Sequence, residues 1–235
     1  MAKPKEEKII ITEHVLEVRH AASGTLLDVR GYIADYIRQE GPFPHWKIDS
    51  NVVNFRDESE SLKLDGAFVG YKSAGYIVLN PKTRNYFTNR ASSFWKVLLK
   101  NNHYKVPPPT RFGSRTKLFF PSVESFETIN TKMYETFFSE SVRNLVGGKE
   151  TDLQFTIDLK EENFQVRVVG GPIQKDEAER YFQFKAEAFS NSGLYLDIDY
   201  FKTKDLSHQD IPKLLKKANE LTWLKAERIA SGLGL

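Results

Sequence analysis

The 235-residue chain contains no cysteine. This absence excludes disulfide bonds, thiolate-ligated zinc, iron–sulfur clusters and thiol catalysis, and it fits a reducing compartment. Long apolar runs are also missing, because no stretch approaches the ~18 residues of a membrane-spanning helix. The apolar run that follows the polar N-terminus, Ile9 to Ile11, is too short for a signal peptide. We therefore expect a cytoplasmic protein without membrane contact and with a disordered tail over residues 1–9.

Motifs for common catalytic chemistries are absent as well. The five histidines never occur in H-x-x-x-H or H-E-x-x-H spacing, so a zinc site has no local support. Gly147-Gly148 and Gly170-Gly171-Pro172 lack the Gly-Lys-Ser/Thr ending of a phosphate loop and the spacing of a Rossmann motif, which favours turns. The sequence predicts neither a cofactor nor a metal site nor a catalytic residue, and it favours a non-catalytic protein.

Acidic residues are missing from residues 66–123, although the chain has 31 of them. This acid-free basic segment contains ten positive charges: Lys72, Lys82, Arg84, Arg90, Lys96, Lys100, Lys105, Arg111, Arg115 and Lys117. With a chain total of +3, the rest of the sequence carries −7. An asymmetry of this kind is typical of a polyanion-binding surface.

Aromatic residues are interleaved with these charges: Tyr86, Phe87, Phe94, Trp95, Tyr104 and Phe112. Lysine and arginine neutralise phosphates, and exposed rings stack on bases, so we predict that the ten basic residues bind nucleic acid, either DNA or RNA. The alternative is that the rings belong to the core and that the basic side chains pair with carboxylates from the other two thirds of the chain.

The spacing of apolar residues predicts an α+β fold with two antiparallel sheet-plus-helix units that meet at Gly147-Gly148. The N-terminal unit, residues 10–147, is expected to hold a strand over 13–21, a helix over 25–39, short strands to residue 79, and helices over 91–100 and 122–146. The C-terminal unit, residues 148–235, is expected to be a four-stranded meander over 153–159, 164–169, 181–189 and 194–201, followed by a long helix over 210–231.

Two groups of carboxylates are candidates for metal-dependent chemistry. Asp197 and Asp199 are two positions apart on a predicted strand, so they share a face and are candidates to hold Mg²⁺. Asp152, followed by Asp158-Leu159-Lys160, has the Asp…Asp-x-Lys order of restriction-type nucleases. The two aspartates are only six positions apart, however, which is closer than that hairpin normally allows.

The run Gly193 to Phe201, GLYLDIDYF, followed by the predicted C-terminal helix, resembles the end of a sporadically distributed, uncharacterised prokaryotic protein family of about this length. The strand Val15 to Arg19 is similar to the opening of that family. The family has no established activity or catalytic residues, so no residue role is carried over. The resemblance implies an accessory gene in mobile-element or antiviral defence loci.

Three functions remain in competition. The first is a non-catalytic nucleic-acid-binding accessory protein that acts as a subunit of a larger prokaryotic complex. The second is a protein-interaction or scaffold subunit, in which the basic segment meets an acidic protein partner. The third is a metal-dependent nuclease that uses one of the two carboxylate groups.

Overall fold

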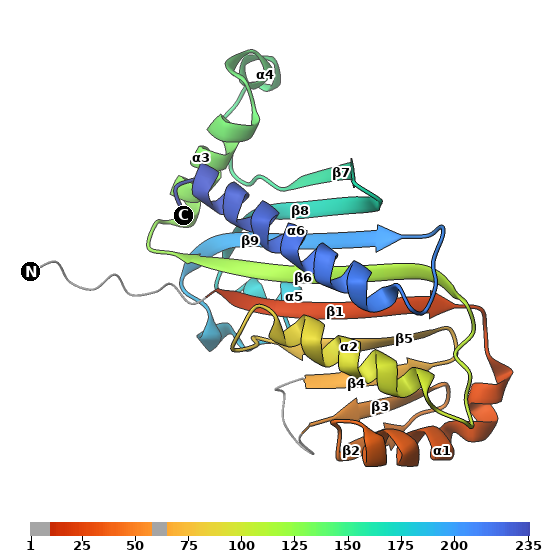
Figure 1. The fold of residues 1–235 in the computed structure, drawn as a ribbon. Helices are drawn as coiled ribbons and strands as arrows, with labels where there is room; N and C mark the ends of the chain where they lie inside the picture. The colour runs from red at the N-terminus through yellow and green to blue at the C-terminus, as the bar shows by residue number, and fades with distance from the viewer. Residues whose placement is uncertain (1–9, 58–64) are drawn as a thin grey trace, which may run out of the picture.

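The computed structural model describes residues 10–57 and 65–235 and contains one sheet of nine antiparallel strands (Figure 1). The strands are β1 (Ile11–His20), β2 (His45–Ile48), β3 (Val52–Arg56), β4 (Asp65–Gly70), β5 (Ser73–Leu79), β6 (Pro109–Ser122), β7 (Phe155–Glu161), β8 (Phe164–Gln174) and β9 (Ser192–Lys202). The predicted disordered tail, residues 1–9, lies outside the described residues.

The first strand of the chain lies in the middle of the sheet. The strand order is β2-β3-β4-β5-β1-β6-β9-β8-β7, and β1 pairs with β5 on one side and with β6 on the other. The prediction of a mixed α and β chain is confirmed, but the prediction of two sheets is wrong. The strands on both sides of Gly147-Gly148 form a single sheet, because the fourteen-residue strand β6 pairs with β9 along much of its length.

Helices α1 (Gly24–Glu40), α2 (Tyr86–Leu99) and α6 (Ile211–Gly232) cover one face of the sheet (Figure 1). Helix α3 (Phe126–Phe137) packs against β8 and β9, and α4 (Glu140–Val146) projects away from the sheet. The short helices α5 (Ala178–Tyr181) and η1 (Ala186–Ala188) lie against the opposite face. Within residues 10–57 and 65–235, no helix is both long and apolar enough to cross a membrane.

Strand alternation divides the side chains of the sheet between these two faces. On β9, Leu194, Leu196, Ile198 and Tyr200 are fully buried under the helices. The same core includes residues from both predicted units, so the two units share one core. We call the side of the sheet that packs under these helices the helix-covered face. The opposite side, toward which the alternate residues of β9 point, is called the open face. A smaller cluster lies on the open face: Ile11, Phe119, Ile173, Ala178, Phe182, Phe189 and Tyr195.

The C-terminal part differs from the predicted four-stranded meander. Residues 181–189 form no strand but contain the end of α5 and the 3₁₀ helix η1. Phe182 and Phe184 have the spacing of a strand. Phe182 instead packs against Tyr195, and Phe189 packs against Phe119, so these rings anchor a compact connection between β8 and β9. The apolar residues of this stretch therefore follow a local packing requirement and not a strand periodicity.

Capping groups set the boundaries of α4. The predicted helix over residues 122–146 is two helices, because the hydroxyl of Ser139 accepts a hydrogen bond from the backbone N–H of Val142 and starts α4. Gly147, at φ 65°, ends α4 as predicted. Helix α2 begins at Tyr86, five residues before the predicted start, and α6 matches its prediction within one residue at each end.

Candidate nucleic-acid interface

The ten basic residues of the acid-free segment do not form one surface. Arg111, Arg115 and Lys117 occupy alternate positions of β6 and point to the open face. The other seven lie in the turn between β4 and β5, around α2, and in the connection from α2 to β6. The structure therefore divides the predicted site into separate parts with different surroundings.

The three basic residues on the open face are held in ion pairs. Arg111 donates to a carboxylate oxygen of Asp199 at 2.8 Å and lies 3.5 Å from Glu17. Arg115 donates to Asp197 at 2.8 Å, and Lys117 donates to Glu13 at 2.9 Å.

These pairs follow from strand register, because β1 and β9 flank β6 and place acidic residues beside its basic ones. Asp197 raises the pKa of Arg115. This part of the predicted site is charge-balanced.

Asp197 and Asp199, the two aspartates considered as a metal-binding pair, belong to the same set of ion pairs on the open face. Asp197 and Asp199 share the open face, but each carboxylate faces its own guanidinium. Burial raises the pKa of Asp199, and the nearby Arg111 opposes that shift. Among residues 10–57 and 65–235, no group of three or more histidine, aspartate or glutamate side chains is arranged to hold a metal ion.

The nuclease-like residues are spread along an edge of the sheet. Asp152 is exposed ahead of β7. Asp158 accepts two hydrogen bonds from Arg167 of β8, at 2.8 and 3.0 Å, and this guanidinium lowers the pKa of Asp158. Lys160 is exposed two positions further along β7. The one close polar contact in this group is thus between an aspartate and an arginine of the neighbouring strand.

Two arginines near α2 have structural partners. Arg84 pairs with Glu227 of α6, and its guanidinium lies over the ring of Trp223, 4.5 Å from the centroid. Arg90 lies 3.5 Å from Asp65, which also accepts hydrogen bonds from the hydroxyls of Tyr76 and Tyr86. Both arginines tie α2 to neighbouring elements.

Five lysines remain, and all of them are exposed. They are Lys72, Lys82, Lys96, Lys100 and Lys105, and none makes an ion pair with a carboxylate of residues 10–57 or 65–235. Lys96 of α2 and Lys100, the residue that caps the C-terminal end of this helix, are four positions apart, so their side chains are neighbours on its outer surface. Positive charge is also favoured at the C-terminal end of a helix, where Lys100 lies.

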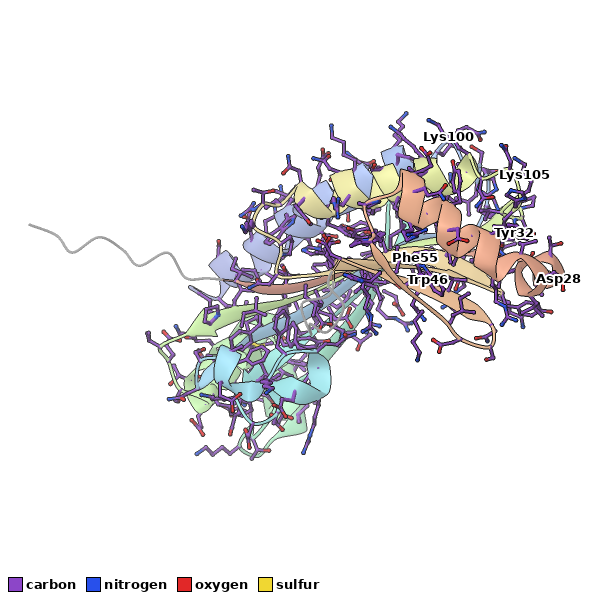
Figure 2. All side chains as sticks on the ribbon, turned by 90° about the horizontal axis from the view of Figure 1, so that it is seen from below. Asp28, Tyr32, Trp46, Phe55, Lys100 and Lys105 are labelled. Carbon is purple, nitrogen blue, oxygen red and sulfur yellow. The ribbon has the colours of Figure 1, made fainter. Side chains whose placement is uncertain are left out.

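An exposed pair of rings lies on the same side of the molecule as Lys100 and Lys105. Tyr32 of α1, 60% exposed, stacks on His103 with ring centroids 4.8 Å apart and an interplanar angle of 20°. Figure 2 shows Tyr32, Lys100 and Lys105 on the same side of the molecule, with Asp28 one helical turn away from Tyr32. We call Tyr32, Lys96, Lys100, His103 and Lys105 the ring-and-lysine patch.

A buried asparagine holds the histidine of this patch in place. The side-chain oxygen of Asn101 accepts hydrogen bonds from the backbone N–H groups of His103, at 2.8 Å, and Tyr104, at 3.1 Å. Lys105 donates to the backbone oxygen of Asn101 at 3.1 Å. Since Tyr104 is itself buried, the turn is anchored from below, and His103 is held outward against Tyr32.

The aromatic residues that the sequence assigned to base stacking are in the core. Phe87, Phe94, Trp95, Tyr104 and Phe112 are buried, and Tyr86 is half-buried. The two rings of the patch, Tyr32 and His103, were not selected from the sequence. A signal for Tyr32 was present, because it lies off the apolar stripe of its helix formed by Leu26, Ile33 and Ile37. No comparable local signal singles out His103, because its ring partner is 71 positions away.

Comparison of the chain with family models, with curated proteins and with solved structures found no match. The resemblance of the C-terminal third to a prokaryotic family therefore stays an expectation.

Proposed function

We propose that this protein is a non-catalytic nucleic-acid-binding accessory protein, a subunit of a larger prokaryotic complex, and that it contacts nucleic acid through the ring-and-lysine patch. The observation that carries the proposal is the exposed Tyr32–His103 ring pair flanked by lysines that have no carboxylate partner among the described residues. The lack of cysteine supports a reducing cytoplasm as its location.

The chemistry of the patch fits single-stranded segments best. Lysines that neutralise phosphates release condensed cations, and this term supplies affinity without sequence preference. An exposed ring stacks on a base only where the base is free of its duplex, as in single strands, loops and ends. Because the open face of β6 is charge-balanced, the positive charge for binding comes from the five lysines of the acid-free segment that have no ion pair with a carboxylate of residues 10–57 or 65–235.

Charge removal tests the phosphate contacts. In the variant Lys96→Gln, Lys100→Gln, Lys105→Gln, the slope of log affinity against log salt concentration should flatten by about 2 to 3 if each lysine contacts one phosphate. Fluorescence anisotropy with single-stranded DNA and RNA of several sequences would measure this. The matched control is Lys149→Gln, Lys185→Gln, Lys204→Gln, which removes the same charge from exposed lysines outside the patch. Equal losses in both variants would contradict the assignment of the patch.

Ring removal tests the stacking contact. Tyr32→Ala should weaken binding of single strands by about 1 to 3 kcal/mol and should leave weak duplex binding unchanged. Tyr32→Phe keeps the ring and should bind like the wild type. If wild-type protein binds neither DNA nor RNA at low salt, nucleic-acid binding by the isolated chain is wrong.

A protein-interaction role is the second candidate, and the arm formed by α4 favours it. Leu145 of α4 is 86% exposed, Val146 is exposed as well, and no residue of α4 is buried. Figure 1 shows α4 standing clear of the sheet. Exposed apolar side chains on a projecting helix are typical of a docking element. Loss of a partner subunit on Leu145→Ser, with nucleic-acid binding intact, would assign the two functions to separate surfaces.

A further inference from the structure

The two edges of the nine-stranded sheet are unequal. Edge strand β2 has four residues and follows Pro42 and Pro44, and proline lacks the N–H that strand pairing needs. Edge strand β7 has seven residues without proline or glycine, and it ends the strand order, with no strand of residues 10–57 and 65–235 beyond it (Figure 1). One backbone edge of β7 therefore has no strand partner among residues 10–57 and 65–235, and its N–H and C=O groups form a template for another strand.

The side chains of β7 are also incompletely covered. Ile157 and Leu159 are 39% and 38% exposed, and they point to the helix-covered face beside Val168 and Val166 of β8. Asp158 and Lys160 alternate with them on the open face. An edge that is long and partly apolar is stabilised when a further strand covers it.

The charges on β7 are complementary to a second copy of the same strand. If two β7 strands pair antiparallel about Leu159, Asp158 of each copy lies opposite Lys160 of the other. Pairing about Asp158 would instead oppose two aspartates, and pairing about Lys160 would oppose two lysines, both of which are unfavourable. Asp158 can accept a second donor in addition to Arg167, because a carboxylate has about four acceptor positions.

We propose that the protein forms a homodimer in which the β7 strands pair antiparallel about Leu159, joining two nine-stranded sheets into one continuous sheet. The two leucines then lie opposite each other, and Ile157 lies diagonally across from Leu159 of the other copy, so the exposed apolar atoms of both strands leave water. Asp158-Leu159-Lys160, which resembles part of a nuclease motif in sequence, thus sets the partner and the register.

Two charge reversals test the proposal. Lys160→Glu places two pairs of like charges across the interface, and Asp158→Lys does the same with the opposite sign. Each should weaken dimerisation at least roughly tenfold in sedimentation velocity, since opposed like charges replace two attractive pairs. Lys204→Glu makes the same charge change as Lys160→Glu on an exposed lysine of the loop between β9 and α6, and it should leave the dimer intact. Thermal unfolding followed by circular dichroism confirms that each variant is folded.

Mixing the two monomeric variants gives the decisive result. In the mixed pair, the carboxylates at positions 158 and 160 of one chain face the lysines at these positions of the other, so a heterodimer should form. Formation of that heterodimer supports the antiparallel register. A monomeric wild type at the highest attainable concentration, full dimerisation of both single variants, or no association on mixing would overturn the proposal.

Discussion

At the scale of single residues, the core contains a buried histidine that lowers the stability of the folded protein at acidic pH. His14 of β1 has no exposed surface, its Nδ1 lies 3.0 Å from Thr116 Oγ1, and its ring stacks on Phe87 at 5.0 Å. Burial lowers the pKa of His14 from 6.5 to about 3. The imidazole is therefore neutral in the folded protein at neutral pH.

Acidification should destabilise the protein through this residue. Between pH 6.5 and pH 3 the unfolded chain binds a proton at His14 that the folded chain does not, so stability falls as pH falls through this range. The loss is about 2 kcal/mol at pH 5 relative to pH 7.5. Urea unfolding of wild type and His14→Gln at both pH values measures it, because the amide does not titrate. A stability difference between the two proteins that does not change with pH would contradict this role.

At the scale of elements, α6 shows what a stripe of apolar residues does and does not determine. The sequence places Ile211, Leu214, Leu215, Ala218, Leu221 and Leu224 on one face. Ile211, Leu215 and Ala218 are buried as expected. Near the C-terminal end of α6, however, Trp223 is buried, whereas Leu224 is 45% exposed. The reason is that α6 packs against both α2 and the central strands β6 and β9, so its buried surface is wider than one stripe.

Two leucines of α6 should respond differently to truncation. Leu215→Ala removes a fully buried side chain and should cost about 2 to 5 kcal/mol of unfolding free energy. Leu224→Ala removes the same atoms from a partly exposed position and should cost less than about 1 kcal/mol. Urea denaturation of both variants checks the contrast, and similar losses would mean that α6 is oriented differently.

At the scale of the whole molecule, the division into residues 10–147 and 148–235 is not reflected in the sheet. β9, from the second part, pairs with β6, from the first, over eleven residue pairs. The main core joins Leu16, Phe94, Leu196 and Leu215. Neither part has a complete core without the other.

We therefore expect one cooperative unfolding transition. Tryptophan fluorescence reports on Trp46 and Trp95 of the first part and on Trp223 of the second, and far-UV circular dichroism reports on the whole sheet, so their urea curves should coincide. Residues 148–235 expressed alone should not fold, because β9 would lose β6 and expose its buried side chains. Two separate transitions, or a folded C-terminal fragment, would favour two independent domains.

The sequence determined the local features of this protein. Period-two and helical spacing located β1, α1 and α6, Gly147 marked the end of α4, and the lack of acidic residues over 66–123 marked the basic segment. These features depend on backbone preferences and side-chain spacing within a few residues, so the local amino-acid sequence is enough to predict them.

Only the tertiary structure decided which of those features meet. Arg111 and Arg115 pair with carboxylates 88 and 82 positions away in the sequence, and Lys117 pairs with one 104 positions away. Tyr32 of α1 stacks on His103, which lies after α2. A strand offers the same N–H and C=O groups to any partner, so strand order follows from packing of the whole chain and not from local pattern. That packing neutralises the charges of three of the ten predicted binding residues, which lie on the open face. It leaves five lysines exposed, two of them on the same side of the molecule as Tyr32, which the sequence did not single out.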